Sequence, residues 1–520
     1  MILFETLLIL LTICVPLTAL AQRFALPPAA VLVIAGGALA FVPGMPAPKL
    51  EPELLLVLFL PPLVQASAYR TDWTVFRANL RPILLLAVGA VLFTAAVVAV
   101  VVKLMIPELP WWAAIALGAI VSPPDVVAAK AVLRRLALPK ELSTILEGEG
   151  VLNDATSLVL YRFAVAAALG ASATLGSAAW HFVLAAIIGA VVGYAVGRGA
   201  MLVFKAIEDN QLDIAVGFLA AYAAYLSAEQ LGGSGVLAAV GCGLVLGQRQ
   251  HQAFTAETRL SAAATWGFVE FVLESLVFIL MGLQLRPILD RLAFEGESYL
   301  ALLAGGVTLA LIGSRFVWMY GAALTTRLRH EPKPLPWSHA SVLSWAGMRG
   351  VVSLAAAIAL PADFPERDLI VFLAFCAILA TLVVQGTTLG WVIQRLGVAL
   401  PQSDLPDPAL TAARALAAEA AHAAIADVVA ARPELQGVAD AVERDLAARA
   451  QRARAVDDDG ERHGETLSLQ VRLKLETIVA ARTALTANTE TLDAEAVRVV
   501  REELDLDEQR LRRILDEDNN

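Results

Sequence analysis

The sequence predicts an all-α polytopic membrane protein with about 13 transmembrane helices and a C-terminal helical tail. Of the 520 residues, 58% are hydrophobic and 17% are charged, whereas a soluble domain has roughly half apolar and a quarter charged residues. Uncharged runs close to the roughly 20 residues that a spanning helix needs recur as far as residue 397. We therefore expect a transmembrane domain over residues 1–397 and a cytoplasmic acidic helical tail over residues 398–520.

The apolar runs place the expected spans along the chain, with edges that the pattern defines only to within a few residues. No basic region precedes the first run, where Glu5 stands instead, so we expect a retained span and no cleaved signal peptide. The expected spans lie near residues 1–20, 25–43, 52–67, 82–106, 112–133, 141–168, 177–205, 211–229, 234–247, 263–285, 299–322, 338–361 and 369–394.

Charged residues in the loops and in the tail indicate how the chain is oriented. Fifteen Lys and Arg residues lie in the loops on one side of these spans and five lie on the other. Because cytoplasmic loops are the ones enriched in Lys and Arg, the N-terminus is expected outside and the C-terminus in the cytoplasm. The tail from residue 401 holds 15 basic and 25 acidic residues, and this net negative charge argues against nucleic acid as a partner.

Two of the expected spans are interrupted in their middle. The stretch VSPPDVVA places Pro123 and Pro124 directly before Asp125, and consecutive prolines break a helix. The stretch WAGMRGVVS sets Arg349 between two glycines. Broken helices at the depth of the bilayer are tolerated where they line a cavity, and they mark the ion sites of transporters. A kink that serves packing alone is the alternative, which the adjacent carboxylate disfavours.

A third polar stretch, EGEGVLNDATSLVLYRF, lies inside the apolar run between these two breaks. On a helix, Glu149 and Asn153 share a face, and Asp154 is turned about 100° from Asn153. Gly148 and Gly150 have no side chains, so a neighbouring element can approach the backbone of this helix closely. Burial favours the protonated form of Asp154 and a nearby cation favours the carboxylate. This group is therefore suited to bind either a proton or a metal cation.

At these residues the chain resembles the NhaP/NHE-type sodium/proton antiporters, in the bacterial branch of the monovalent cation:proton antiporter-1 family. EGEGVLNDATSLVL is similar to their E-G-E-S-x-x-N-D signature, and VSPPDVVA to their unwound aspartate helix. LFLPPLVQASAYRTDW resembles their third span, and WAGMRGVVSLAAAIALP their G-x-R-G-x-x-S span. The resemblance extends over almost the whole chain.

The resemblance implies a fold and an activity. The fold is two inverted repeats of six helices with two broken crossing helices, and the protein is a homodimer in the lipid of the bacterial plasma membrane. The activity is secondary transport, not enzyme catalysis, and needs no cofactor. It exchanges Na⁺, or else K⁺ or Li⁺, for H⁺ without net charge movement, and serves pH and sodium homeostasis.

The resemblance also assigns residues. Asp154 and Asp125 match the family's cation ligands for Na⁺, and Asp154 also binds the proton. Asn153 matches the asparagine of the electroneutral group. Three departures are Gly150, Gln65 and Pro124, where many members have Ser, Glu and Thr. The remaining implied residues are an ion pair between Glu149 and Arg349 and backbone ligands at Ser122, Pro123 and Pro124.

Other charges inside the apolar runs are interpreted as structural. Arg162 and Arg315 each require a negative partner in the membrane, and Glu270 and Glu274, one helical turn apart, could neutralise them. Gly243 and Gly247 have the small-xxx-small spacing of helix packing.

Two functions compete with transport. An intramembrane aspartyl protease would use Asp125 and Asp154 on consecutive spans. The protease families of this kind have Tyr-Asp and Gly-x-Gly-Asp motifs, whereas this chain has Pro-Asp and Asn-Asp at the two positions. A sensor that does not transport would signal through the acidic tail, yet it would have no use for two broken helices around a carboxylate.

Overall fold

The computed structural model places helices throughout the part of the chain that it describes, and no strand occurs there. It divides into two compact units, residues 1–400 and residues 401–520. The described residues are 2–24, 26–43, 52–71, 73–125, 129, 138–170, 175–207, 209–254, 256–292, 296–329, 334–399, 408–433, 436–437 and 439–443, with single positions at 475, 478, 504, 507 and 508.

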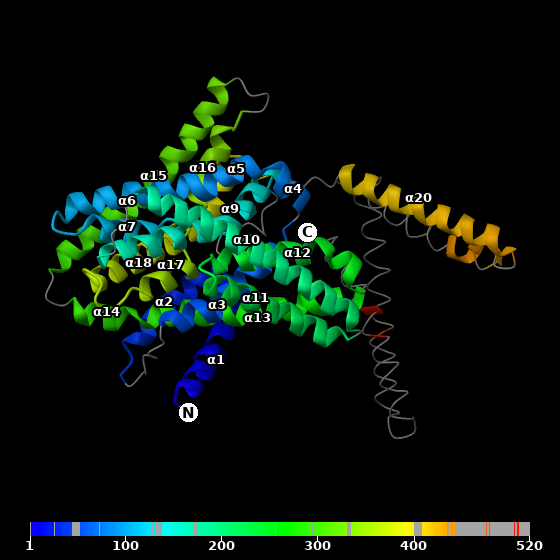
Figure 1. Ribbon diagram of the computed structural model, residues 1–520, viewed down its shortest axis with the longest axis horizontal. Helices are drawn as coiled ribbons and strands as arrows, with labels where there is room; N and C mark the ends of the chain where they lie inside the picture. Colours follow the sequence, from blue (N-terminus) through cyan, green and yellow to red (C-terminus); the bar gives the residue numbers. More distant parts are fainter. Residues whose placement is uncertain are drawn as a thin grey trace. The chain divides into compact units, whose positions relative to one another are not determined.

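The first unit is a bundle of helices that lie side by side (Figure 1). Two of its helices contain π-helical turns, η1 at Leu85–Ala90 and η2 at Thr381–Gln385, each continuous with its neighbours in the chain. The α-helices are α1 (Ile2–Arg23), α2 (Pro28–Ala40), α3 (Pro52–Tyr69), α4 (Trp73–Ala78), α5 (Leu80–Leu84), α6 (Val91–Met105), α7 (Trp111–Val121), α9 (Lys140–Ala168), α10 (Leu175–Ala206), α11 (Asn210–Gln230), α12 (Gly235–Ala253), α13 (Ala256–Leu283), α14 (Leu285–Arg291), α15 (Glu297–Leu328), α16 (Trp337–Trp345), α17 (Val351–Ile358), α18 (Arg367–Ala380) and α19 (Gly386–Arg395).

Seven helices of the described chain are long and apolar enough to cross a membrane. Shorter apolar helices accompany them at residues 28–40, 57–69 and 111–121, which agrees with spans predicted near the same positions. The all-helical membrane fold is therefore confirmed, while thirteen spans stay a prediction. The seven long helices cover Glu5–Arg23, Leu80–Met105, Val183–Ala206, Asn210–Gln230, Thr258–Asp290, Glu297–Leu328 and Arg367–Arg395.

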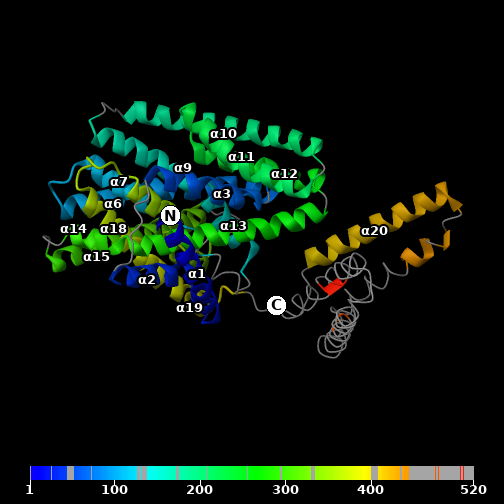
Figure 2. The same cartoon turned by 90° about the horizontal axis from the view of Figure 1, so that it is seen from below.

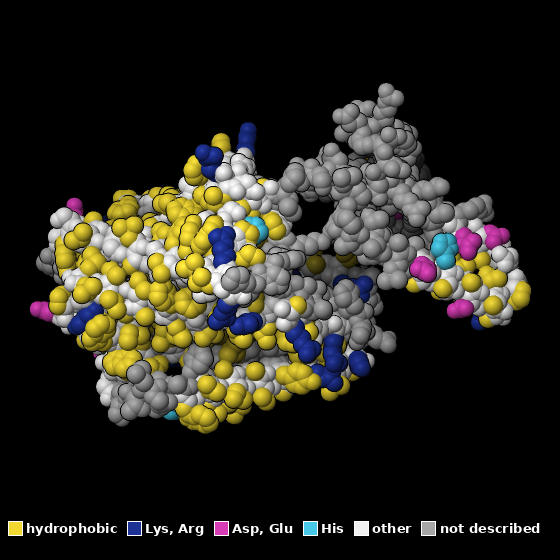
Figure 3. Space-filling view, turned by 90° about the horizontal axis from the view of Figure 1, so that it is seen from above, with side chains coloured by type: hydrophobic (Ala, Val, Ile, Leu, Met, Phe, Trp, Pro, Cys, Tyr) yellow, Lys and Arg dark blue, Asp and Glu magenta, His cyan; other side chains and the backbone are white. Residues whose placement is uncertain are grey.

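The outer surface of this unit is apolar. Large hydrophobic side chains on it are widely exposed, including Leu309 at 73% and Trp180 at 64% of their surface. Figure 3 shows hydrophobic side chains spread across the visible face of the bundle. An apolar surface of this extent is unfavourable in water and matches a lipid environment, because lipid tails are as apolar as the side chains.

Helices α10, α11 and α12 pack together along one side of the bundle (Figure 2). Helix α12 also packs on α3, and Gly243 and Gly247 face the backbone of α3 at Gln65 and Tyr69. A Cβ atom at either glycine would overlap that backbone. The prediction that these two glycines serve helix packing is confirmed.

Both predicted breaks are present, and they meet. Helix α7 ends at Val121, and residues 122–125 are not helical. Between α16 and α17, residue 346 is a turn and residues 347–350 have no regular secondary structure. The backbone N–H of Asp125 donates a hydrogen bond of 2.6 Å to the carbonyl oxygen of Met348. The two interruptions, more than 200 residues apart in the chain, therefore share one place in the fold.

The second unit contains one long described helix, α20 (Pro408–Ala431), and short helical turns at residues 436–437 and 439–443. Its alanine-rich sequence favours a helix, since alanine has the highest helix propensity. Most of the described side chains are exposed, as expected for a polar appendage. The boundary of a cytoplasmic tail at residue 398 stays a prediction.

The approach of α12 to α3 generates a prediction. Gly247→Ala should lower the melting temperature of the purified protein in detergent, since the added methyl overlaps the Tyr69 backbone and overpacking costs about 1–3 kcal/mol. Gly267→Ala in α13 is the control, because no described atom lies within 4 Å of its Cβ position. That control should be neutral or stabilising, as Ala is the better helix former. Equal melting temperatures for the two variants would contradict the close approach.

Candidate functional site

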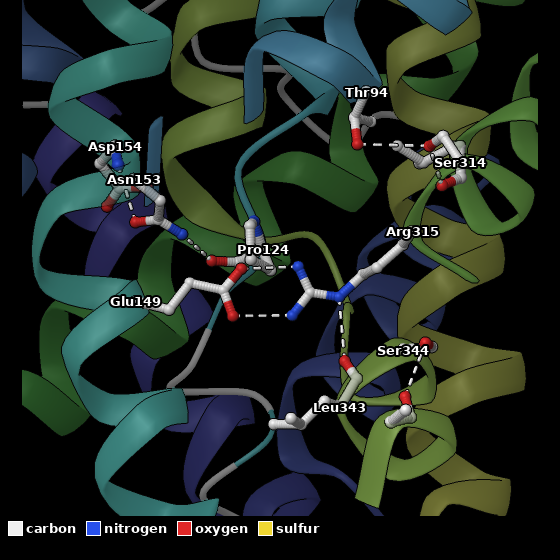
Figure 4. A network of polar contacts seen from close by, with 11 residues as sticks. Thr94, Pro124, Glu149, Asn153, Asp154, Ser314, Arg315, Leu343 and Ser344 are labelled. Carbon is white, nitrogen blue, oxygen red and sulfur yellow. Dashed lines mark hydrogen bonds and ion pairs between the residues drawn. The ribbon is translucent and has the colours of Figure 1, made fainter. Parts of the chain in front are cut away.

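Asn153 connects helix α9 to the first helix break. Its side chain is fully buried, and its Nδ2 donates a hydrogen bond of 2.6 Å to the carbonyl oxygen of Pro124. Its Oδ1 accepts a hydrogen bond of 2.7 Å from the backbone N–H of Asp154 (Figure 4). The amide thereby gives the Pro124 carbonyl in the break a hydrogen-bond partner on α9, and it holds Asp154 beside the break.

Asp125 and Asp154 line the same cavity, which has a volume of about 60 Å³. Pro123 and Pro124 lie in its wall, and Gly150 faces it from α9. A cavity of this size admits water molecules or a small cation, and two carboxylates supply the oxygen atoms that hard cations prefer. The sequence placed these two aspartates on separate spans, and the fold brings them together.

The second break shapes the position of Asp125. The carboxylate of Asp125 lies against Gly350, where any Cβ atom would collide with it. Because Gly350 has no side chain, the Asp125 carboxylate has room at the junction of the two broken segments. Ser122, predicted as a backbone ligand, is not part of the cavity wall, and its hydroxyl donates to the Ala119 carbonyl at 3.1 Å. Of the three predicted backbone ligands, Pro123 and Pro124 are the two that face the cavity.

The predicted ion pair between Glu149 and Arg349 is wrong in its cationic partner. Glu149 is fully buried and binds Arg315, itself 4% exposed, through two hydrogen bonds of 2.6 and 2.7 Å (Figure 4). Arg315 also donates from Nε to the Leu343 carbonyl at 3.0 Å. The guanidinium of Arg315 lies against Gly347, where the absence of a side chain leaves room for it.

Arg349 is buried at the second break without this carboxylate as a bonded partner. Its backbone N–H donates to the hydroxyl of Thr381 at 3.2 Å. Within the described chain, its Nε and Nη1 have no hydrogen-bond partner. Its neighbours in the sequence, Met348 and Gly350, both contact Asp125. Arg349 thus places a buried guanidinium at the second break, close enough to Glu149 and Arg315 to interact electrostatically with both.

The predicted neutralisation of Arg162 and Arg315 by Glu270 and Glu274 is also wrong. Arg162 pairs with Glu229 at 2.6 Å, and Arg315 pairs with Glu149 as described. Glu270 pairs instead with Arg70 at 2.6 Å, on the more exposed side of the bundle. The pattern within one helix could not assign these partners, because each partner comes from a distant part of the chain.

Glu274 and Ser353 lie in the wall of the cavity, where the sequence did not place them. In the sequence, Glu274 is interpreted as a charge inside an apolar run. Ser353 is the last residue of the G-x-R-G-x-x-S motif. Gln65 lies outside that wall, although Val64 and Ser67 belong to it. Its Nε2 donates to the Gly217 carbonyl at 2.7 Å.

Comparison with known proteins identifies relatives over most of the chain. The family described as sodium/hydrogen exchanger, transmembrane, matches residues 8–395. A sodium, potassium, lithium and rubidium/H⁺ antiporter from Bacillus pumilus is 35% identical over 366 residues, 66% of this chain and 54% of the relative. The chain thus spans about half the length of that relative. The Na⁺/H⁺ antiporter ApNhaP from Aphanothece halophytica is 31% identical over 400 residues, 76% of this chain and 75% of the relative.

A solved structure shares the fold. The sodium proton antiporter MjNhaP1 from Methanocaldococcus jannaschii superposes with a TM-score of 0.62 at 16% sequence identity. The match covers 74% of this chain and all of the other chain. At that identity the likeness concerns the arrangement of the helices.

The buried pair between Glu149 and Arg315 generates a prediction. Arg315→Ala leaves the Glu149 carboxylate buried without its partner, which should reduce stability by roughly 3–5 kcal/mol and lower the melting temperature and yield in detergent. Arg286→Ala is the control, since its pair with Asp290 is 47% and 72% exposed on the two side chains and such pairs contribute about 1 kcal/mol or less. An Arg315→Ala protein as stable as the control would contradict a structural role for the pair.

Proposed function

The chain belongs to the transmembrane sodium/hydrogen exchanger family, and we propose that it exchanges a monovalent cation for H⁺ across the bacterial plasma membrane. The observation that carries the proposal is that Asp125 and Asp154 line one cavity where two broken helices meet. The chain is a transporter by family, and secondary transport without enzyme catalysis is part of this proposal. Na⁺ is the proposed substrate, with K⁺ and Li⁺ as alternatives of the same chemistry.

Asp154 is the group that binds the cation and the proton by turns. It lies in the cavity wall, and a buried carboxylate in a low-dielectric site retains a proton unless a cation compensates its charge. A cation that enters the cavity displaces the proton, and a proton that returns displaces the cation. This competition couples the two flows without any covalent step.

The other residues of the site have supporting roles in this proposal. Asp125 provides a second carboxylate, and Pro123 and Pro124 present the broken backbone to the cavity. Asn153 is uncharged and holds Asp154 and Pro124 together through its two hydrogen bonds. Only one carboxylate of the Asn-Asp pair can therefore change its charge.

The identity of the cation is supported by the relatives. The names of the Bacillus pumilus and Aphanothece halophytica proteins give Na⁺ as a substrate, and the first also gives potassium, lithium and rubidium. We propose further that the protein works as a homodimer, with the N-terminus outside, for pH and sodium homeostasis. The excess of Lys and Arg on one set of loops supports that orientation.

Asp154→Asn should abolish cation-dependent proton flux in proteoliposomes, because an amide neither binds H⁺ nor compensates a cation. The variant should remain folded and retain the melting temperature of the wild type within a few degrees, since Asn has the same size. Asp290→Asn is the control, a largely exposed aspartate beside Arg286, and should transport normally. Substantial flux in the purified Asp154→Asn protein would remove Asp154 from the mechanism.

Exchange should be electroneutral, because one carboxylate alternates between one proton and one monovalent cation. An imposed membrane potential should then neither drive nor slow Na⁺-dependent proton flux, whereas each elementary charge moved would contribute roughly 2.3 kcal/mol per 100 mV. The measurement is flux in liposomes with valinomycin-clamped potentials, together with capacitive current on a supported membrane. A steady current, or a rate that follows the potential, would show that Asp125 or another group carries a second proton.

A further inference from the structure

Ser353 presents a buried hydroxyl to the cavity. It lies in the first turn of α17, directly after the second break, and is 2% exposed. Its Oγ has no hydrogen-bond partner in the described part of the chain. A buried hydroxyl without a partner is unfavourable, so native proteins seldom retain one without a use.

Glu274 contributes a third carboxylate residue to the same cavity wall. It comes from α13, a helix that packs on both α3 and α17. Glu270 lies one turn earlier on that helix and forms two hydrogen bonds with Arg70, at 2.6 and 3.0 Å, away from the cavity wall. Two glutamates of one helix thus have different environments, and only Glu274 faces the space that Asp125 and Asp154 line.

The number of oxygen atoms around the cavity explains what these two residues can do. A hard cation that leaves water requires several oxygen ligands, and two carboxylates with few water molecules supply only part of such a shell. Gly150 faces the cavity from α9 without any side-chain oxygen. Ser353 and Glu274 add a hydroxyl and a carboxylate on α17 and α13 to a wall that also contains apolar side chains such as Leu60 and Phe278.

We propose that Ser353 and Glu274 form a second side of the cation site. The Ser353 hydroxyl binds the cation directly, and the Glu274 carboxylate attracts and holds it in the cavity while Asp154 exchanges its proton. Glu274 keeps one protonation state through the cycle in this arrangement, so it changes the affinity for the cation and leaves the stoichiometry unaltered. The inference rests on the proposed function and names further ligands of the same site.

The experiment compares two pairs of matched variants in proteoliposomes. Ser353→Ala is set against Ser344→Ala, a buried serine in α16 whose hydroxyl donates to the Ala340 carbonyl at 2.7 Å and which is not in the cavity wall. Glu274→Gln is set against Glu270→Gln on the same helix. Half-saturation by Na⁺ and maximal rate are measured for each variant at fixed pH, together with the stabilisation of the purified protein by Na⁺ in thermal unfolding.

Ser353→Ala and Glu274→Gln should each raise the Na⁺ concentration for half-saturation by roughly five- to tenfold, the scale of one lost ligand contact. Their stabilisation by Na⁺ should shift to higher concentration by the same factor, because ligand-induced stabilisation follows the dissociation constant. Ser344→Ala and Glu270→Gln should match the wild type in both measurements.

A wild-type half-saturation value in either cavity variant would overturn the two-sided site, as would equal shifts in a cavity variant and its control. Those outcomes leave Na⁺-coupled exchange by the wild type intact. A wild-type protein that shows no Na⁺-dependent proton flux would instead overturn the proposed function, and the Na⁺-dependent unfolding measurement would then still report whether the cavity binds the cation.

Discussion

Inside a bilayer, each backbone N–H and carbonyl group at a break in a helix must find a partner within the protein, because no bulk water reaches it. The two breaks of this chain satisfy that constraint through hydrogen bonds to each other and to a third helix. The N–H of Asp125 in the first break donates to the carbonyl of Met348 in the second, and Asn153 caps the carbonyl of Pro124 from a third helix. The polar residues of the candidate site are therefore the residues that make the broken backbone tolerable in lipid.

A second constraint is that buried charges must be compensated. Glu149 and Arg315 are buried deeply and meet in a bidentate pair, which gives two short hydrogen bonds in a low-dielectric surrounding. Desolvation makes such a pair costly, but the loss of either partner costs more. The pair connects α9 with α15, and the Leu343 carbonyl adds α16 to the same network. The helix that carries Asp154 is thus tied to the second broken span by charge as well as by packing.

These two constraints leave a small cavity, which is the proposed place of ion exchange. Glu149 forms hydrogen bonds with Arg315, and Asn153 donates to the Pro124 carbonyl. Asp125 and Asp154 line the cavity beside them. Gly350 provides the room for the Asp125 carboxylate. In the proposed mechanism, the cation and the proton compete for the same oxygen atoms in this cavity.

The sequence by itself determined the helices, both breaks and the aspartates, because hydrophobicity, proline and glycine act locally along the chain. The run predicted at 141–168 is helix Lys140–Ala168, and the run at 211–229 is helix Asn210–Gln230. Only the tertiary structure decided which partner each buried charge has. Arg315 and Arg349 both lie far from Glu149 in the chain, and a pattern holds no information on which guanidinium the packing brings to it. For the same reason the fold alone revealed Ser353 and Glu274 in the cavity wall, since a shared cavity is a property of helices that the sequence keeps apart.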